Sequence, residues 1–194
     1  MNKKTEQKQK SREAIAASAT SLLRERGIKA SSVMDVMKGA GLTVGGFYSH
    51  YDSKEDLFVE TLRNASSANW GHLLKSAKGD TPRSRTLSVI KQYLSRKHRD
   101  NKDAGCLLPS TAPEIARQGE PYRSALEKEL SGFVDALADM IAAGAESREK
   151  ALGLIALMYG ALSLSRAVAG TRLSDEFLQA GRKLAERALA DEEA

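Results

Sequence analysis

Apolar residues along this chain recur mainly every three or four positions, which is the period of amphipathic α-helices. One short stripe of this kind consists of Val33, Val36, Met37 and Ala40. Ser32 can cap the first turn of this helix, with Asp35 at the third helical position as in a capping box. Gly39 and Gly41 are expected to end the helix, and we expect Gly41 to supply the positive φ that lets the chain reverse.

A second short helix is predicted after this glycine turn, and a third helix begins directly after the second. Thr43 can cap the second helix, and Ser53 and Asp56 repeat the capping pair at the start of the third. Three helix starts within the 25 residues from Ser32 to Asp56 form a dense local signal. The pattern predicts a helix-turn-helix whose second helix, Val44–His50, is exposed and able to enter a DNA major groove.

The rest of the pattern predicts an all-α protein. After a basic arm at residues 1 to about 7, the expected helices are Lys8–Arg26, Lys54–Ala77, one from Pro82, a brief or kinked one within Cys106–Ile115, one from Pro121, Ala151–Leu164 and Ser174–Leu189. The prolines at positions 109 and 113 are the reason for expecting only a brief helix there.

The last two predicted helices indicate a dimer. The helix at 151–164 is apolar nearly all round, so it must be covered on more than one side. Gly153, Ala156, Gly160 and Ser163 make one edge of it small enough for close approach of another helix. On the last helix, Phe177, Gly181, Leu184 and Ala188 are expected to share one face. Two such helices from each subunit predict a four-helix interface, and a buried helix in a monomer is the alternative.

The distribution of charged residues along the chain indicates a binding partner. The net charge is +5; residues 1–54 hold 10 Lys and Arg against 5 Asp and Glu, while residues 55–194 hold 20 against 20. The whole excess therefore coincides with the predicted helix-turn-helix, as expected for a surface that binds DNA phosphates.

Composition narrows the class further. The chain has one cysteine, which excludes an internal disulfide framework and a cysteine-based zinc site and favours a reducing cytoplasm. The first ten residues lack the apolar core of a signal peptide, and about fourteen apolar residues at 151–164 are too few to span a bilayer. His72 and His98 lack histidine partners at helical spacing, so we expect no metal and no cofactor.

The helix-turn-helix segment resembles the DNA-binding signature of the TetR family of bacterial transcriptional regulators. The resemblance runs through Gly41, Thr43, Gly45, the Phe47-Tyr48 pair, His50 and Ser53-Lys54-Glu55. It implies an all-helical homodimer that is not an enzyme. A three-helix DNA-binding domain is implied at 1–54, with the start of a linking helix to about 60, and a larger dimerisation and ligand-binding domain at 61–194. The family's mode of action implies a repressor that leaves its operator DNA when a small-molecule effector, expected to be largely apolar, binds.

Two departures from the family pattern bear on DNA recognition. Tyr51 stands where the family usually has Phe, and Gly46 stands where a side chain often touches DNA. The candidate DNA-binding residues are Ser32, Thr43, Val44, Gly45, Gly46, Tyr48, Ser49, His50, Tyr51 and Lys54. Tyr48, Tyr51 and Lys54 suit phosphate, and Ser49 and Val44 suit base edges or thymine methyls.

The candidate effector-binding residues are His98, Cys106, Arg117 and Tyr122. Cys106 carries two alternatives: a regulator that senses oxidants through this thiol, or a small helical thiol enzyme that pairs Cys106 with His98. Next to Leu107 and Leu108, however, a lone thiol is more often a buried small hydrophobic group.

Overall fold

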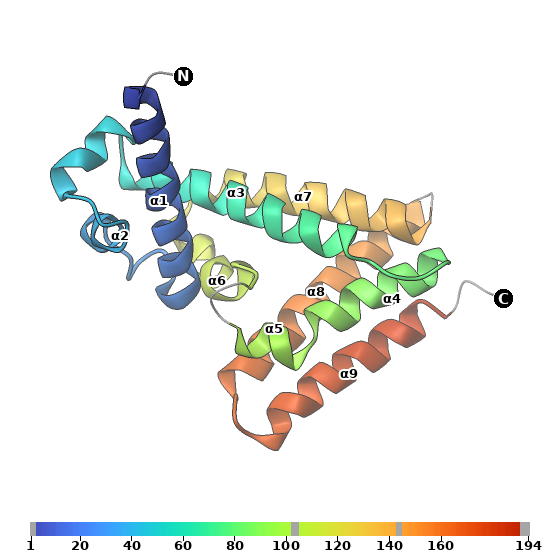
Figure 1. The fold of residues 1–194 in the computed structure, drawn as a ribbon. Helices are drawn as coiled ribbons and strands as arrows, with labels where there is room; N and C mark the ends of the chain where they lie inside the picture. Colours follow the sequence, from blue (N-terminus) through green and yellow to red (C-terminus); the bar gives the residue numbers. More distant parts are fainter. Residues whose placement is uncertain (1–2, 102–104, 143–144, 191–194) are drawn as a thin grey trace. The chain divides into compact units, whose positions relative to one another are not determined.

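The computed structural model describes residues 3–101, 105–142 and 145–190, and in these ranges every regular element is a helix (Figure 1). The elements are α1 (Lys3–Arg26), α2 (Val33–Gly39), the 3-10 helix η1 (Val44–Ser49), α3 (Lys54–Lys75), α4 (Pro82–Tyr93), α5 (Arg96–Asp100), α6 (Leu108–Gln118), α7 (Tyr122–Ile141), α8 (Ala145–Ala167) and α9 (Arg172–Ala188). The all-α class predicted from the apolar period is confirmed. None of the helices in these ranges combines the length and the apolar character needed to cross a membrane.

The chain divides into two compact units, each made of two separate stretches of sequence. The first unit comprises Met1–Ser66 and Cys106–Glu127, and the second comprises Ser67–Gly105 and Lys128–Ala194. The sequence predicts a consecutive division near residue 60. The packing instead groups Cys106–Glu127, which includes α6, with the helix-turn-helix.

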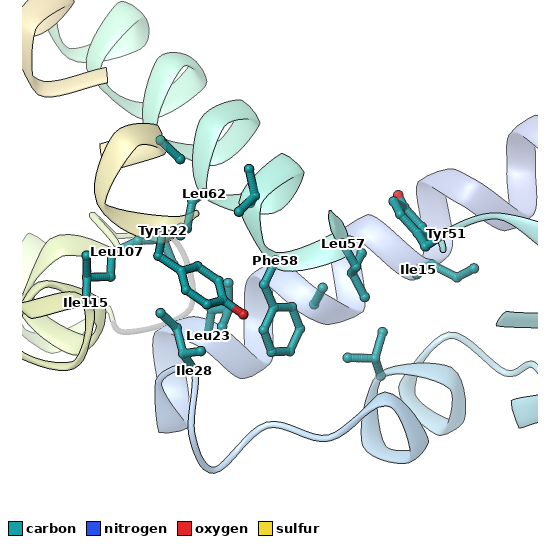
Figure 2. Close-up of a cluster of buried hydrophobic side chains, with 14 of the residues drawn as sticks. Ile15, Leu23, Ile28, Tyr51, Leu57, Phe58, Leu62, Leu107, Ile115 and Tyr122 are labelled. Atoms are coloured by element: carbon teal, nitrogen blue, oxygen red, sulfur yellow. The ribbon is translucent and has the colours of Figure 1, made fainter. Parts of the chain in front are cut away.

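The core of the first unit explains this grouping. Its buried side chains come from α1, α2, η1 and α3 and also from the segment that begins at Cys106 (Figure 2). Leu107, Ile115 and Tyr122 are each at most 4% exposed and belong to the same cluster as Ile28 and Phe58. Burying these three side chains stabilises the unit by several kcal/mol, at roughly 1.5–3 kcal/mol for each large apolar group. The first unit therefore depends on a segment that begins 50 residues after the end of the helix-turn-helix in the sequence.

Three helix starts differ from the sequence predictions, and one of them is that of α8, which begins at Ala145 and not at Ala151. α1 begins at Lys3, so residues 3–7 of the predicted basic arm are helical, while residues 1–2 lie outside the described ranges. This stretch is rich in Lys, Glu and Gln, which are good helix formers. The N-cap of α9 is Thr171, whose side chain accepts from the Ser174 backbone N–H; Ser174 itself is fully buried and bonds to Ser165 on α8.

In the second unit, α8 and α9 form a hairpin that packs on α4 (Figure 1). Gly181 permits this packing because a Cβ there would lie 2.9 Å from Leu94 Cδ1 and 3.0 Å from Ala161 Cβ. The sequence predicts one shared face for Gly181 and Leu184, but the packing separates them: Gly181 is buried and Leu184 is 50% exposed. The outer face of the hairpin instead carries exposed or half-exposed apolar and small side chains at Leu152, Gly153, Ala156, Gly160, Leu164, Leu173, Phe177 and Leu184.

Candidate nucleic-acid interface

The first helix of the helix-turn-helix, α2, begins and ends as its sequence predicts. Ser32 Oγ accepts a hydrogen bond from the Asp35 N–H at 3.1 Å and donates one to Asp35 Oδ2 at 2.7 Å. Gly41 has φ +70°, a value that glycine adopts without steric cost, and the Leu42 N–H donates to the Met37 carbonyl. This turn fixes the direction in which the chain enters the next helix.

The second helix, η1, is a 3-10 helix over Val44–Ser49 and not an α-helix. Its first turn is closed by the hydrogen bond from the Gly46 N–H to the Thr43 carbonyl, and its end by the bond from the His50 N–H to the Phe47 carbonyl. Thr43 occupies the N-cap position, but its side chain makes no capping hydrogen bond. Gly45 and Gly46 weaken an α-helix by about 1 kcal/mol each relative to alanine, which accounts for the tighter and shorter helix.

One face of η1 is left open. Phe47 is fully buried, whereas its neighbour Tyr48 is 72% exposed and Val44 is 46% exposed. A Cβ at Gly45 would meet no atom within 4 Å, so a ligand could approach the backbone closely there. The exposed Ser49 hydroxyl donates to the Gly46 carbonyl at 2.7 Å, which holds the side chain along the helix. The open face thus offers an aromatic ring, a small apolar group and bare backbone.

Tyr51 lies on the opposite side, in the core. It is 5% exposed, and its hydroxyl donates to Glu60 Oε1 at 3.1 Å. Arg12 donates to both oxygens of the same carboxylate and lies 5.0 Å above the Tyr51 ring. Burial and the neighbouring Glu60 carboxylate raise the pKa of Tyr51 to about 12. The Tyr51 hydroxyl thus donates its hydrogen bond to Glu60 inside the core. The sequence predicts a contact with a DNA phosphate, but in this arrangement the hydroxyl is not exposed for one.

His50, the residue directly after η1, is half-buried. Its Nδ1 is buried and has no hydrogen-bond partner within the described residues. Burial lowers the pKa of His50, and the positive charges of Lys8 and Arg12 lower it further. The imidazole is therefore neutral near pH 7, and an adjacent anion would favour its protonated form.

The remaining predicted DNA-binding residues lie at helix starts. Ser32 is partly engaged in capping α2, and Lys54 is at the first position of α3 with its Nζ 5.2 Å from the centre of the Phe58 ring. Lys8 and Met34 are further candidates that the sequence pattern does not single out. Lys8 is exposed on α1 near His50, and Met34 on α2 is 63% exposed. If the helical period of α1 is extended toward its N-terminus, Lys8 falls on the helix and not at its first residue.

The four predicted effector-binding residues fall in different units. Cys106 and Tyr122 are each 4% exposed in the first unit, where Tyr122 packs in the hydrophobic core, and Arg117 is on the exposed side of α6. His98 belongs to the second unit and lines a pocket of about 420 Å³ there. His98 is thus the only one of the four residues that lines this pocket.

This pocket lies between the end of α3 and the α4–α5 segment, and polar and apolar atoms share its surface about equally. The described lining has three amide side chains (Asn69, Gln92 and Asn101), two imidazoles (His72 and His98) and the lysine Lys97. Leu73, Tyr93 and Ser95 complete it. His98 Nδ1 lies 2.7 Å from the Tyr93 carbonyl, which can only accept, so Nδ1 carries the proton. Burial lowers the pKa of His98, and the positive charge of Arg166 lowers it further, so the ring is neutral near pH 7. None of the described residues that line this pocket carries a carboxylate.

The part of the chain that the structure describes contains no cluster suited to a metal ion. Three or more His, Cys, Asp or Glu side chains are nowhere gathered there in a way that would hold one.

The fold, the capped helix-turn-helix and the open face of η1 define a DNA-binding protein of the helix-turn-helix class. Residues 15–61 match the family model described as "Bacterial regulatory proteins, tetR family". The HTH-type transcriptional repressor NemR of Escherichia coli K12 is 29% identical over 150 residues, which covers 76% of this chain and 74% of NemR. The repressor KstR2 of Rhodococcus jostii is 44% identical over 45 residues, or 23% of this chain and 22% of KstR2.

A solved structure of one of these relatives has the same fold as this chain. The crystal structure of the reduced form of E. coli NemR superposes with a TM-score of 0.78 at 25% identity, covering 91% of this chain and 95% of NemR. The chain belongs to the TetR family of bacterial regulatory proteins. It is a DNA-binding transcriptional regulator and not an enzyme, and regulators of this family act as dimers.

Proposed function

We propose that this protein is a cytoplasmic, homodimeric repressor that binds operator DNA through the open face of η1 and leaves it when a small effector binds the second unit. The observation that carries the proposal is the opposite exposure of Phe47 and Tyr48, which presents η1 outward on a well-packed, net-positive unit. The relatives NemR and KstR2 are named as repressors, which supports repression as the mode of action.

The open face favours DNA binding through phosphates and shape. Val44–His50 contains no Arg, Lys, Asn or Gln, the side chains that make bidentate contacts to base edges. Tyr48 and Lys54 can donate to phosphates, and the bare backbone at Gly45 allows close approach. Operator affinity is then expected to depend strongly on salt, with part of the selectivity supplied by the deformability of the DNA.

We place the dimer interface on the outer face of the α8–α9 hairpin. A Cβ at Gly153 or Gly160 would meet no atom within 4 Å in the subunit, although both glycines lie in the middle of a helix. Leu152 and Leu164 on α8 and Leu184 on α9 are each 50% exposed. Small residues flanked by exposed leucines are what close helix packing between two copies requires.

We assign the effector to the pocket that contains His98. The described lining residues include three amides, two imidazoles and one ammonium group and no carboxylate, which suits a small molecule with several acceptor oxygens, such as a carboxylate. This chemistry differs from the largely apolar effector expected from the sequence. By population shift, an effector that binds better to one spacing of the two DNA-binding units than to another would move the dimer away from the spacing that fits successive major grooves.

Selection of bound duplexes from a random pool tests the proposal. The dimer should enrich a palindrome whose half-sites are about one helical turn apart. Tyr48→Ala should reduce the enrichment, while Lys183→Ala on α9 should not. Enrichment of no sequence, or of a single half-site, would contradict the proposal.

The thiol alternative remains a second candidate because the NemR structure is described as a reduced form. The 4% exposure of Cys106 weighs against it, since oxidant-sensing thiols are generally accessible. Loss of operator affinity on peroxide treatment that Cys106→Ser abolishes would favour this candidate over effector control.

A further inference from the structure

A single carboxylate from α6 lies at the end of α1, where the helix-turn-helix begins. The backbone N–H groups of Ile28 and Lys29 both donate to Glu114 Oε2, at 2.7 and 2.8 Å. The Ile28 and Lys29 amides follow directly on the last turn of α1, and the sequence separates them from Glu114 by more than 80 residues. Hydrogen bonds from N–H groups to an ionised carboxylate are roughly twice as strong as neutral ones.

The glycine at the end of α1 allows this contact. Gly27 has φ +75°, which turns the chain so that the next two N–H groups point toward α6. A Cβ at Gly27 would lie 2.6 Å from Glu114 Oε1 and 2.9 Å from Cδ, so only glycine leaves room for the carboxylate. Buried Ser31 donates to the Gly27 carbonyl at 2.6 Å. The loop from Gly27 to Ser31 is thus held at its amides by Glu114 and closed on itself by Ser31.

This loop leads directly into the DNA-binding helices. Ser32, the next residue, is the N-cap of α2, so the position of the loop sets where α2 begins. The side chains on both sides are also fixed, since Ile28 is 2% exposed and Ile115, adjacent to Glu114, is 3% exposed in the same core (Figure 2). Glu114 therefore joins α6 to the start of the helix-turn-helix through the backbone rather than through a side-chain pair.

We propose that Glu114 is a positioning residue for DNA binding: it fixes the α1–α2 loop and thereby the orientation of α2 and η1. A carboxylate on a unit that binds phosphates opposes binding on electrostatic grounds alone. Its removal therefore has opposite expected effects in the two accounts: positioning predicts weaker operator binding, and charge repulsion predicts tighter binding.

Three variants in the full chain test the proposal on the selected operator and on a scrambled duplex. Glu114→Ala should weaken operator binding about tenfold, the loss expected when two charge-assisted hydrogen bonds are removed and both amides are left unpaired, while scrambled duplex is bound no more weakly than by wild type. Glu114→Gln should stay within about threefold of wild type, because both amides use one oxygen and a single amide oxygen can accept both bonds. Glu127→Ala removes the same charge from an exposed position of this unit and should not weaken operator binding.

Two measurements separate positioning from loss of fold. The ratio of operator to scrambled affinity should fall only in Glu114→Ala, since a smaller folded fraction would weaken both duplexes equally. The Ile28 and Lys29 amide proton resonances should move upfield in Glu114→Ala and remain close to wild type in Glu114→Gln. The proposal is overturned if Glu114→Ala binds operator as tightly as wild type, or if Glu114→Gln is as defective as Glu114→Ala. Failure of the wild-type chain to bind any selected duplex would instead refute the proposed function.

Discussion

Neighbouring aromatic residues in the helix-turn-helix have different roles. Phe47 is fully buried, Tyr48 is 72% exposed, and Tyr51 is buried again at 5%. A 3-10 helix has three residues per turn, so positions 47 and 50 share one side while 48 turns outward. The sequence indicates an aromatic cluster beside a DNA-binding surface, but only the packing separates the residue available to DNA from the two that stabilise the unit.

The environment of Tyr51 leads to a prediction about its hydroxyl. In Tyr51→Phe the ring stays buried and Glu60 retains Arg12, so the free energy of unfolding should fall by only about 1 kcal/mol. Operator affinity should change less than about twofold, because the hydroxyl is not presented to DNA. Chemical denaturation and an operator titration measure the two quantities. A large loss of operator affinity in a stably folded Tyr51→Phe protein would show that the hydroxyl reaches a phosphate after all.

His50 leads to a prediction about pH. Its pKa is lowered in the free protein, chiefly by burial, and a phosphate beside the ring would raise it in the complex. Binding would then take up a proton, so operator affinity should increase as the pH falls from about 7.5 to about 5.5, through the usual pKa of about 6.5. Titrations over this range, with His50→Gln as the control, should show a weaker increase in the variant. Equal pH dependence in both proteins would identify His50 as a packing residue.

At the scale of elements, the sequence predicts the helices well and some of their boundaries poorly. The apolar period and the caps at Ser32 and Ser53 locate the helix-turn-helix. The start of α9 is missed because Thr171 and Ser174 are both good caps in sequence, and only the burial of Ser174 against α8 decides between them. The packing of α6 with the helix-turn-helix could not be predicted either, because Glu114 meets Ile28 through tertiary structure alone.

Two glycines on the α8–α9 hairpin give a matched pair of tests for the interface. Gly181→Ala should destabilise the subunit by about 1–3 kcal/mol, because the added methyl meets Leu94 and Ala161. Gly160→Ala should leave the subunit folded, since its Cβ meets nothing within 4 Å, but should weaken the dimer by crowding the partner helix.

Analytical ultracentrifugation and thermal unfolding at one protomer concentration measure both effects. Gly160→Glu should give monomers or insoluble protein. A soluble and fully dimeric Gly160→Glu protein would show that the interface lies elsewhere.

At the scale of the whole molecule, the positive charge is concentrated in a stretch of sequence and not in one of the two units. Residues 1–54 hold the whole excess and residues 55–194 are balanced, whereas the first unit holds 13 Lys and Arg against 11 Asp and Glu and the second holds 17 against 14. The sequence therefore predicts which end of the chain meets DNA. It does not predict the pocket that we propose for the effector, because polar residues that line a pocket and polar residues on an open surface look alike until α3, α4 and α5 are packed together.

DNA binding as proposed requires the start of α3 and the open face of η1 to lie on the phosphate backbone of an operator. The most direct measurement is a titration of selected operator and scrambled duplex at several salt concentrations with wild type, Lys54→Ala and the charge-matched control Lys183→Ala. Lys54→Ala should weaken both duplexes by similar factors and flatten the log–log salt dependence by about 0.9 for each phosphate that is no longer neutralised, or about two units for one phosphate in each subunit. Lys183→Ala should leave the slope unchanged. If Lys54→Ala alters neither the affinity nor the slope, the helix-turn-helix does not sit on the DNA backbone as described.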